Sequence, residues 1–348
     1  MRTIFIAASV AFVISVFATP WLIKWLRARG IGQEIRDDGP VEHPHLAKAG
    51  TPTMGGIAIV GAATGGYLIA HLRTHDISFA RSGIVLIGLL LGCGLVGFVD
   101  DYLGVRKRRN LGLRKRGKLG GQLLVATGFA LLALHWAQAS THLSFTRDLD
   151  LDLGTWVWTA WAVIVIISAS NAVNLTDGLD GLAAGSAVLV FAAFTIIGFW
   201  EFRHPEVYGV APAQAVDLAT VSAAMMGACA GFLWWNAAPA QVFMGDTGAL
   251  AIGGVLAGLA LLTRTHLLLP IIGGLFMVET LSVIAQVVAY RGFKRRVLRM
   301  APIHHHFELS GWPEFTVIVR FWLFAGLFVA LGVGLFYADF INIPGAID

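Results

Sequence analysis

The chain has 348 residues, of which 57% are hydrophobic and only 13% are charged, with a formal net charge of +4. This charged fraction is about half that of an ordinary soluble domain, and a soluble protein of this size could not bury so much apolar surface. The composition therefore excludes a soluble globular enzyme and indicates an integral membrane protein. The two cysteines, Cys93 and Cys229, lie inside apolar stretches and form neither a disulfide framework nor a zinc-binding pattern.

Ten apolar stretches approach or exceed the length needed to cross a bilayer as helices. They are 3–25, 54–71, 83–99, 119–138, 155–171, 180–200, 214–235, 248–263, 267–290 and 315–337. The first could be read as a signal peptide, but its apolar run continues to Lys24 and Arg27, which suits a retained span. We predict an all-α integral membrane protein, a bundle of about ten transmembrane helices with cytoplasmic active-site loops, forming a single domain over 1–348.

Positive charge is divided unevenly between the two sets of loops. One set consists of 24–53, 100–118, 172–179, 236–247 and 291–314. It holds eighteen of the 25 lysines and arginines, whereas the opposite set, with both termini, holds six. The positive-inside rule places the first set in the cytoplasm and both termini outside. The polar segments between the spans belong to this first set, so we expect the chemistry on one membrane face.

Asp100 and Asp101 end the third predicted span, in the sequence GFVDDY. Adjacent carboxylates at a helix C-terminus repel each other and the negative end of the helix dipole, unless a cation compensates them. Neighbouring helical residues point about 100° apart, so one can bind a metal while the other contacts a substrate. The alternative is a solvated acidic cap, although polar residues at membrane depth tend to be functional.

The segment NAVNLTDGLDG, residues 171–181, joins the fifth and sixth predicted spans. Thr176 is expected to cap the sixth span, with Asp177 and Asp180 on one face of its first turn. Acidic residues are favourable at a helix N-terminus, so capping explains part of the pattern. Two Asn and two Asp residues exceed what a cap requires, which favours a polar pocket for a base or ribose.

Two further segments carry candidate ligand-binding residues. Asp246 lies where the loop turns into the eighth span, beside Gly245, which permits close backbone approach to a ligand. Phe243 suits stacking on a planar base, or anchoring at the membrane interface, so this segment is ambiguous by itself. The run His304 to His306 cannot face one point on a helix, which argues against a zinc site built from it alone. On an ordered loop, one or two of these imidazoles can contact phosphate.

Basic residues flank these segments in the stretches 106–118 and 291–299. Such clusters attract anionic lipid and fix topology, and they would also concentrate an anionic nucleotide and a lipid phosphate. Lys48 is a further candidate for a phosphate contact. At least five carboxylates facing a basic rim suit Mg²⁺ and pyrophosphate, because Mg²⁺ prefers a few carboxylates together with phosphate oxygens.

Together these motifs are typical of one family. They are GTPTMGG (50–56), Asp100-Asp101, NLGL (110–113), NAVNLTDGLDG (171–181), PAQVFMGDTG (239–248) and PIHHHFE (302–308). From about residue 32 to residue 320 the chain resembles the polyprenyl-phosphate N-acetylhexosamine-1-phosphate transferase superfamily. The first and last motifs resemble its muramoyl-pentapeptide branch. Gly104 stands where members usually have Lys, and Ala249 where Ser is frequent.

The resemblance implies a Mg²⁺-dependent, homodimeric enzyme of the bacterial inner membrane that needs no nucleic acid. It would transfer phospho-N-acetylmuramoyl-pentapeptide from UDP-N-acetylmuramoyl-pentapeptide to undecaprenyl phosphate, giving lipid I and UMP in peptidoglycan synthesis. The implied catalytic residues are Asp100, Asp101, Asp246 and His304, with Asp101 and Asp246 as Mg²⁺ ligands. The implied substrate contacts are Lys48, Asn174, Asp177, Asp180, Asn236, Phe243, Gln286 and His305. Direct attack by the lipid phosphate is favoured over an aspartyl-phosphate intermediate, which stays open.

Two other functions also stay open. A sister transferase that uses UDP-N-acetylglucosamine shares the Asp motifs but not the PIHHHFE segment. A secondary transporter would place its polar residues near the bilayer midplane, whereas here they cluster at span ends. Only Glu279 and Pro270 in the ninth span favour a transporter, and a bent helix forming a lipid-phosphate groove explains them equally well.

Overall fold

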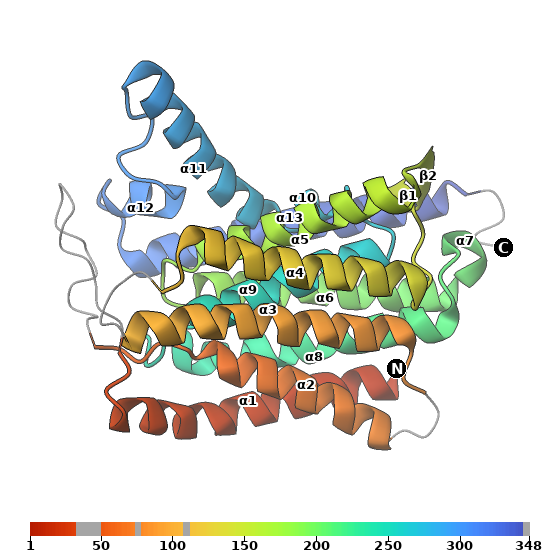
Figure 1. The fold of residues 1–348 in the computed structure, drawn as a ribbon, viewed down its shortest axis with the longest axis horizontal. Helices are drawn as coiled ribbons and strands as arrows, with labels where there is room; N and C mark the ends of the chain where they lie inside the picture. Colours follow the sequence, from red (N-terminus) through yellow and green to blue (C-terminus); the bar gives the residue numbers. More distant parts are fainter. Residues whose placement is uncertain (33–49, 74–77, 107–111, 344–348) are drawn as a thin grey trace.

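The computed structural model describes residues 1–32, 50–73, 78–106 and 112–343, so Lys48 lies outside the described residues. The chain forms a bundle of long helices with one small antiparallel sheet at one end (Figure 1). In chain order the elements are α1 (Arg2–Ala28), α2 (Gly56–Arg73), α3 (Arg81–Arg106), α4 (Lys115–His135), β1 (His142–Ser144), β2 (Asp148–Asp152), α5 (Gly154–Thr176), α6 (Leu182–Arg203), α7 (Pro205–Tyr208), α8 (Pro212–Asn236), α9 (Gly245–Leu262), α10 (Leu269–Ile272), α11 (Gly274–Phe293), α12 (Ile303–Glu308) and α13 (Glu314–Ile341).

Every predicted span coincides with helix, which confirms an all-α membrane architecture. Within the described ranges, nine helices are long and apolar enough to cross a membrane, and α2 is a shorter apolar helix. The ninth predicted span is broken, because α10 and α11 are separate helices on either side of Gly273. The short sheet has no counterpart among the predicted elements; its second strand, Asp148–Asp152, alternates Asp and Leu with the two-residue period of a strand.

Helix α9 lies at the centre of the bundle. Every residue from Thr247 to Leu262 is buried, and the helix packs against α2, α3 and α5. Of its apolar window 89% is buried, against 28% for each of the outer helices α1, α4, α5, α11 and α13. Large apolar side chains such as Phe17, Leu124 and Leu327 are exposed on those outer helices, as expected for surfaces that contact hydrocarbon.

Small residues let the inner helices approach closely, as is common in membrane bundles. A Cβ atom added to Gly253 of α9 would lie 2.3 Å from the carbonyl oxygen of Ala169 in α5. A Cβ atom added to Gly97 of α3 would lie 2.2 Å from the carbonyl oxygen of Asp246. The second contact brings the end of α3 against the beginning of α9, where the predicted catalytic aspartates lie.

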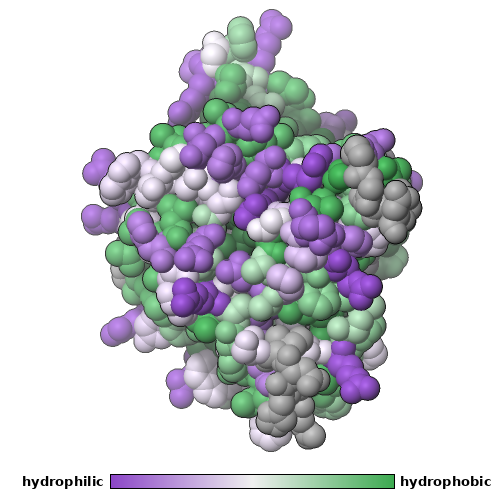
Figure 2. Space-filling view, turned by 90° about the vertical axis from the view of Figure 1, so that its right-hand side faces the viewer, coloured by the Kyte–Doolittle hydropathy of each residue, from purple (hydrophilic) through white to green (hydrophobic). Residues whose placement is uncertain are grey.

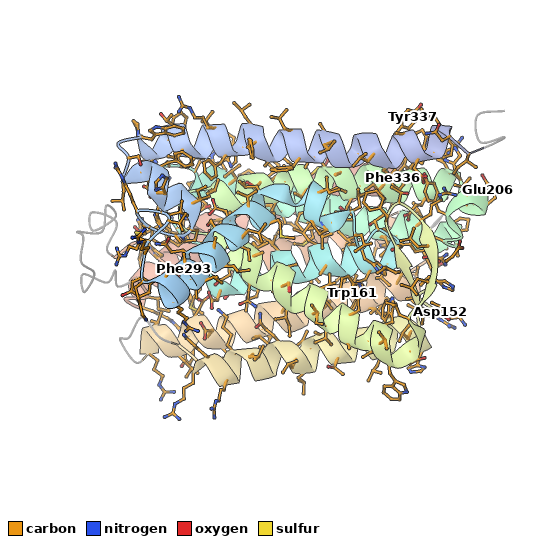
Figure 3. All side chains as sticks on the ribbon, turned by 90° about the horizontal axis from the view of Figure 1, so that it is seen from above. Asp152, Trp161, Glu206, Phe293, Phe336 and Tyr337 are labelled. Carbon is orange, nitrogen blue, oxygen red and sulfur yellow. The ribbon has the colours of Figure 1, made fainter. Side chains whose placement is uncertain are left out.

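The two ends of the bundle differ in content (Figure 1). One end, called the opposite end below, carries the start of α1, the end of α13, the sheet and α7; the other, called the site end, carries α12 and the first turns of α4 and α9. Figure 2 looks at the opposite end, where hydrophilic residues are spread over the end face and hydrophobic residues lie around it. In Figure 3, Phe293 lies at the site end, and Asp152 and Glu206 lie at the opposite end.

Helix α11 leaves the bundle toward the site end (Figure 1). Pro270 opens the short helix α10, where its missing N–H costs no helical hydrogen bond. Gly274 then begins α11 against Phe328 of α13, where an added Cβ atom would lie 2.3 Å from the ring. The predicted bend of the ninth span is therefore a complete break between two helices.

Candidate active site

The first turn of α9 is held by Asp101, which comes from α3. One carboxylate oxygen accepts the N–H of Asp246 at 3.0 Å. The other accepts the N–H and the hydroxyl of Thr247 at 2.9 and 2.6 Å. These bonds pair N–H groups that have no partner within the helix, at the positive, N-terminal end of α9. Gly245, with φ +70°, makes the turn into this helix. Both oxygens of Asp101 are thus used to fix the position of Asp246.

Asp100 and Asp246 face each other across a lysine. Lys118, in the first turn of α4, contacts the Oδ2 atom of Asp246, and its Nζ lies 4.0 Å from the Oδ2 atom of Asp100. Asp100 also accepts the N–H of Leu113 at 2.8 Å, and Asp246 accepts the side-chain amide of Asn174 at 2.5 Å. Because α3 continues to Arg106, the aspartate pair lies within its last two turns and does not end the helix as predicted.

Lys118 is the site residue that sequence reasoning missed. It is one of eight positive charges in the basic stretch 106–118, and nothing in the sequence separates it from its neighbours. Its place in the first turn of the helix that follows the aspartate pair was the available signal. A loop joining two antiparallel helices returns that turn to the same end of the bundle as Asp100.

The turn between α5 and α6 differs from the prediction. Thr176 is the last residue of α5, and its hydroxyl donates to the carbonyl of Ala172 at 2.9 Å. The predicted capping of the sixth span by Thr176 is therefore wrong; Gly181, with φ +80°, precedes α6 instead. A Thr hydroxyl in a helix interior readily bonds the carbonyl four residues back, which removes it from capping.

Asp177 and Asp180 lie in this turn with different surroundings. Burial raises the pKa of Asp177 to about 8, and the nearby negative charges of Asp246, Asp101 and Asp180 raise it too. Asp180 is buried, and its carboxylate accepts the N–H of Ala240 at 2.9 Å. Asp177 therefore adds to the acidic group at α9, whereas Asp180 ties the turn to the loop before α9.

That loop follows Asn236, the last residue of α8, and contains Phe243. Asn236 is buried and donates to the carbonyl of Val242 at 2.9 Å, which closes the loop on itself. The backbone of Phe243 donates to the carbonyl of Pro52 and accepts the N–H of Gly55, each at 2.8 Å, and its side chain is partly exposed. The segment 52–55 is thus paired with the loop that leads to Asp246.

The three histidines lie on the short helix α12 and diverge, as predicted. His304 pairs with Glu279 of α11, with 3.0 Å between Nδ1 and a carboxylate oxygen. His305 pairs with Glu308 at 2.7 Å, and Nδ1 of His306 accepts the N–H of Arg299 at 3.1 Å. His304 is fully buried, so in this structure no part of it is open to a ligand.

Gln286 lies one element earlier, in α11. Its side-chain carbonyl accepts the N–H groups of Val297 and Leu298, and its amide donates to the carbonyl of Leu298. This side chain therefore holds the backbone that leads from α11 to α12.

Most of the predicted residues fall into two groups at the site end, which Lys118 and Glu279 join. The aspartate group surrounds the first turn of α9 and consists of Asp100, Asp101, Lys118, Asn174, Asp177 and Asp246. The histidine group consists of Glu279, Gln286, His304 and His305 and surrounds α12. They meet at Gly178, where an added Cβ atom would lie 2.4 Å from Nε2 of His304.

The aspartate group offers the chemistry that a hard cation requires. Asp100 and Asp246 supply carboxylate oxygens on either side of a positive charge, here the ammonium of Lys118. Within the described ranges no group of three or more His, Cys, Asp or Glu side chains is arranged to hold a metal. One or two carboxylates suffice for Mg²⁺ when a substrate supplies phosphate oxygens, so these donors fit that ion.

The fold and this one-ended site define a multi-span membrane transferase. Residues 83–264, more than half of the chain, match the model of Glycosyl transferase family 4, and residues 48–60 match phospho-N-acetylmuramoyl-pentapeptide-transferase signature 1. The chain is 52% identical to the phospho-N-acetylmuramoyl-pentapeptide-transferase of Frankia alni, over 98% of this chain and 99% of that protein. It is 51% identical to the protein of the same name from Saccharopolyspora erythraea, over 99% of each chain. The chain belongs to the phospho-N-acetylmuramoyl-pentapeptide-transferase family.

Proposed function

We propose that this chain transfers phospho-N-acetylmuramoyl-pentapeptide from UDP-N-acetylmuramoyl-pentapeptide to undecaprenyl phosphate. The products are undecaprenyl-diphosphate-linked muramoyl-pentapeptide (lipid I) and UMP, which makes this a step of peptidoglycan synthesis. The observation that carries the proposal is family membership at about half identity over nearly the whole chain. The meeting of Asp100, Lys118 and Asp246 at one end of the bundle supports it.

The proposed setting is the bacterial inner membrane, with the site end in the cytoplasm and both termini outside. Support comes from the excess of Lys and Arg in the loops of the site end. A cytoplasmic site also suits a soluble UDP-linked substrate. A homodimer is proposed from the family resemblance alone.

The proposed cofactor is Mg²⁺, held by Asp246 together with Asp100. Asp101, predicted as a ligand, has both oxygens bonded to the start of α9, so its proposed part is to place Asp246. When bound, Mg²⁺ neutralises charge on the pyrophosphate and on the departing UMP.

In the proposed reaction an oxygen of the lipid phosphate attacks the β-phosphorus of the UDP-sugar. The bond from that phosphorus to the bridging oxygen breaks, and UMP leaves with the electron pair. Lys118 stabilises negative charge on the phosphates, and Asp100 positions the lipid phosphate or accepts its proton. We favour this direct route; a phosphoryl-enzyme trapped at an aspartate with the UDP-substrate alone would overturn it.

The UDP-sugar is proposed to bind beside the turn 177–181. Asn174, Asp177 and Asp180 offer polar groups there, and the partly exposed ring of Phe243 suits a planar base. His305 and Lys48 stay proposed contacts to phosphate or sugar, Lys48 from outside the described residues.

The test is a transferase assay on the full chain in detergent. UDP-N-acetylmuramoyl-pentapeptide, undecaprenyl phosphate and Mg²⁺ are supplied, and UMP release and lipid product are followed. We expect product from the wild type and none after EDTA or with Asp246→Asn. Turnover of UDP-N-acetylglucosamine in its place would instead assign the chain to the sister activity.

A further inference from the structure

Glu279 is an acidic residue inside a membrane-spanning helix. Its side chain has no exposed surface, although a charged group in such a place is costly and is usually paired. Its Oε2 atom lies 3.0 Å from Nδ1 of His304, whose side chain is also completely buried. The proposed reaction does not use Glu279, so the pair needs a separate explanation.

The pair is part of a rigid connection between α11 and α12. Ser282, three residues after Glu279, donates its hydroxyl to the backbone carbonyl of Glu279 at 2.6 Å. The same hydroxyl accepts the N–H of Ile303 at 3.0 Å, at the beginning of α12. Two contacts from one region of α11 therefore fix where α12 begins and how His304 is turned.

His304 reaches the aspartate group with its other nitrogen. With Nδ1 directed at Glu279, Nε2 points toward Gly178, where an added Cβ atom would lie 2.4 Å away. This 3.0 Å ion-pair contact with a carboxylate favours a proton on Nδ1 and limits the orientations open to the buried ring. Gly178 directly follows Asp177 in the turn 177–181, so the ring supports this turn from the side of α12.

We propose that Glu279 is a positioning residue, which acts through His304 to hold the turn 177–181 in the conformation that binds the nucleotide half of the substrate. The inference rests on the proposed function, because that function assigns the turn to the UDP-sugar. It makes His304 a support for the turn, and it gives the acidic residue in the membrane helix a role at the site end.

A double-mutant cycle tests whether Glu279 acts through His304. Glu279→Leu, His304→Leu and the double variant are compared in detergent by UMP affinity from calorimetry and by thermal midpoint. Each single change should weaken UMP binding about tenfold, a coupling typical of contacting residues, and the double variant should be no weaker than the weaker single one. Losses that multiply to about a hundredfold would overturn the proposal.

Further variants separate positioning from general damage. Glu279→Gln keeps an acceptor for Nδ1–H and should restore most of the UMP affinity. Thr280→Val is the matched control, because the Thr280 hydroxyl donates to the Phe276 carbonyl of its own helix, and it should leave the UMP affinity unchanged. Equal losses of UMP affinity in Glu279→Gln and Glu279→Leu, with the KM for the UDP-substrate unchanged, would overturn the proposal.

Gly178→Ala keeps the proposal testable if the Leu variants fail to fold. The added Cβ atom must displace the His304 ring or the turn, without leaving a buried group unpaired. We expect a loss of UMP affinity and a raised KM for the UDP-substrate, with KM for the lipid phosphate unchanged. Wild-type UMP affinity in Gly178→Ala would overturn the proposal.

UMP binding is measured without turnover, so the two proposals can fail separately. A wild type that binds UMP but forms no lipid product disproves the proposed function and leaves the cycle interpretable. A wild type that transfers normally, together with Glu279 and Gly178 variants of unchanged UMP affinity, disproves the positioning role alone.

Discussion

The two ends of the bundle differ in how their buried and half-buried carboxylates are paired. At the opposite end, Asp217 is fully buried and bonded to Tyr67, His71 and the N–H of Ala80, at 2.9 to 3.0 Å. Asp339 pairs there with Arg147 through two hydrogen bonds, and Asp148 pairs with Arg264. These three acids are balanced by partners within the fold, whereas the buried Glu201 of α6, at the same end, has no hydrogen-bond partner among the described residues.

At the site end the negative charge of the aspartates is only partly compensated by partners within the fold. Asp246 lies near both Asp100 and Asp177, and within the described ranges Lys118 is the cation paired with Asp100 and Asp246. Grouped like charges destabilise a protein unless something outside the fold compensates them. Acids paired by the fold serve stability, whereas a group of several close acids that share one cation, unlike the single buried Glu201, marks the place for a ligand.

The largest expected effect is the loss of activity on changing Asp246 to Asn. The amide cannot supply the negative charge that binds a cation, so we expect transfer to fall by about 10³-fold or more, as for other groups that stabilise transition-state charge. The thermal midpoint should change little, because the loss of the ion pair with Lys118 is offset by the removal of like-charge repulsion from the neighbouring acids. The exposed Asp150 of β2, changed to Asn, is the control and should alter neither quantity. A marked drop in the midpoint of Asp246→Asn would show that the acids of the site end are structural.

The matching change at the opposite end is Asp217→Leu, and it should act on stability. It leaves Tyr67, His71 and the N–H of Ala80 without their buried partner, which costs about 3–5 kcal/mol for a broken buried pair. Thermal unfolding in detergent measures this loss, with Asp150→Asn again as the control. The fraction that stays folded should keep its KM for both substrates; a changed KM would mean that the two ends are coupled.

Lys118→Met should have an intermediate effect. Without the ammonium group, Asp246 loses its ion pair and the phosphates lose a positive charge, so we expect about a 10²-fold loss of transfer. Lys115→Met is the matched control, because that side chain is exposed in the same turn of α4. Equal activities of the two variants would remove Lys118 from the site.

The bundle could be predicted from sequence because apolar stretches of bilayer length leave the chain no other structure. The break at Gly273 was predicted only as a bend, since Pro270 permits either and the packing of Gly274 on Phe328 decides it. Motif order also placed Asp100, Asp246 and Asn174 in one site. Two contacts were not predicted: the capping of α9 by Asp101 from α3, and the bond of the Thr176 hydroxyl to a carbonyl of its own helix.

The roles of charged residues were the least predictable part of the site. Lys118 resembles its basic neighbours in sequence, and only the return of α4 beside α3 selects it. Glu279 favoured a transporter as a lone acid in a span, and its partner lies far along the chain, at His304. Such pairs depend on tertiary packing, which a one-dimensional pattern does not contain.

The smallest predicted effect is a pH dependence of stability caused by Asp177. Burial holds its pKa at about 8, above the ordinary value of 3.8, so the fold favours the protonated form. The stability from that proton is complete below about pH 4 and is lost as the pH rises through 8. Between pH 6 and 9 the thermal midpoint of the metal-free wild type should therefore fall more steeply than that of Asp177→Asn. The control is Asp150→Asn, whose curve should parallel the wild type. If Asp177→Asn also parallels the wild type, Asp177 is ionised throughout this range and the negative charge of the site end is already balanced within the fold.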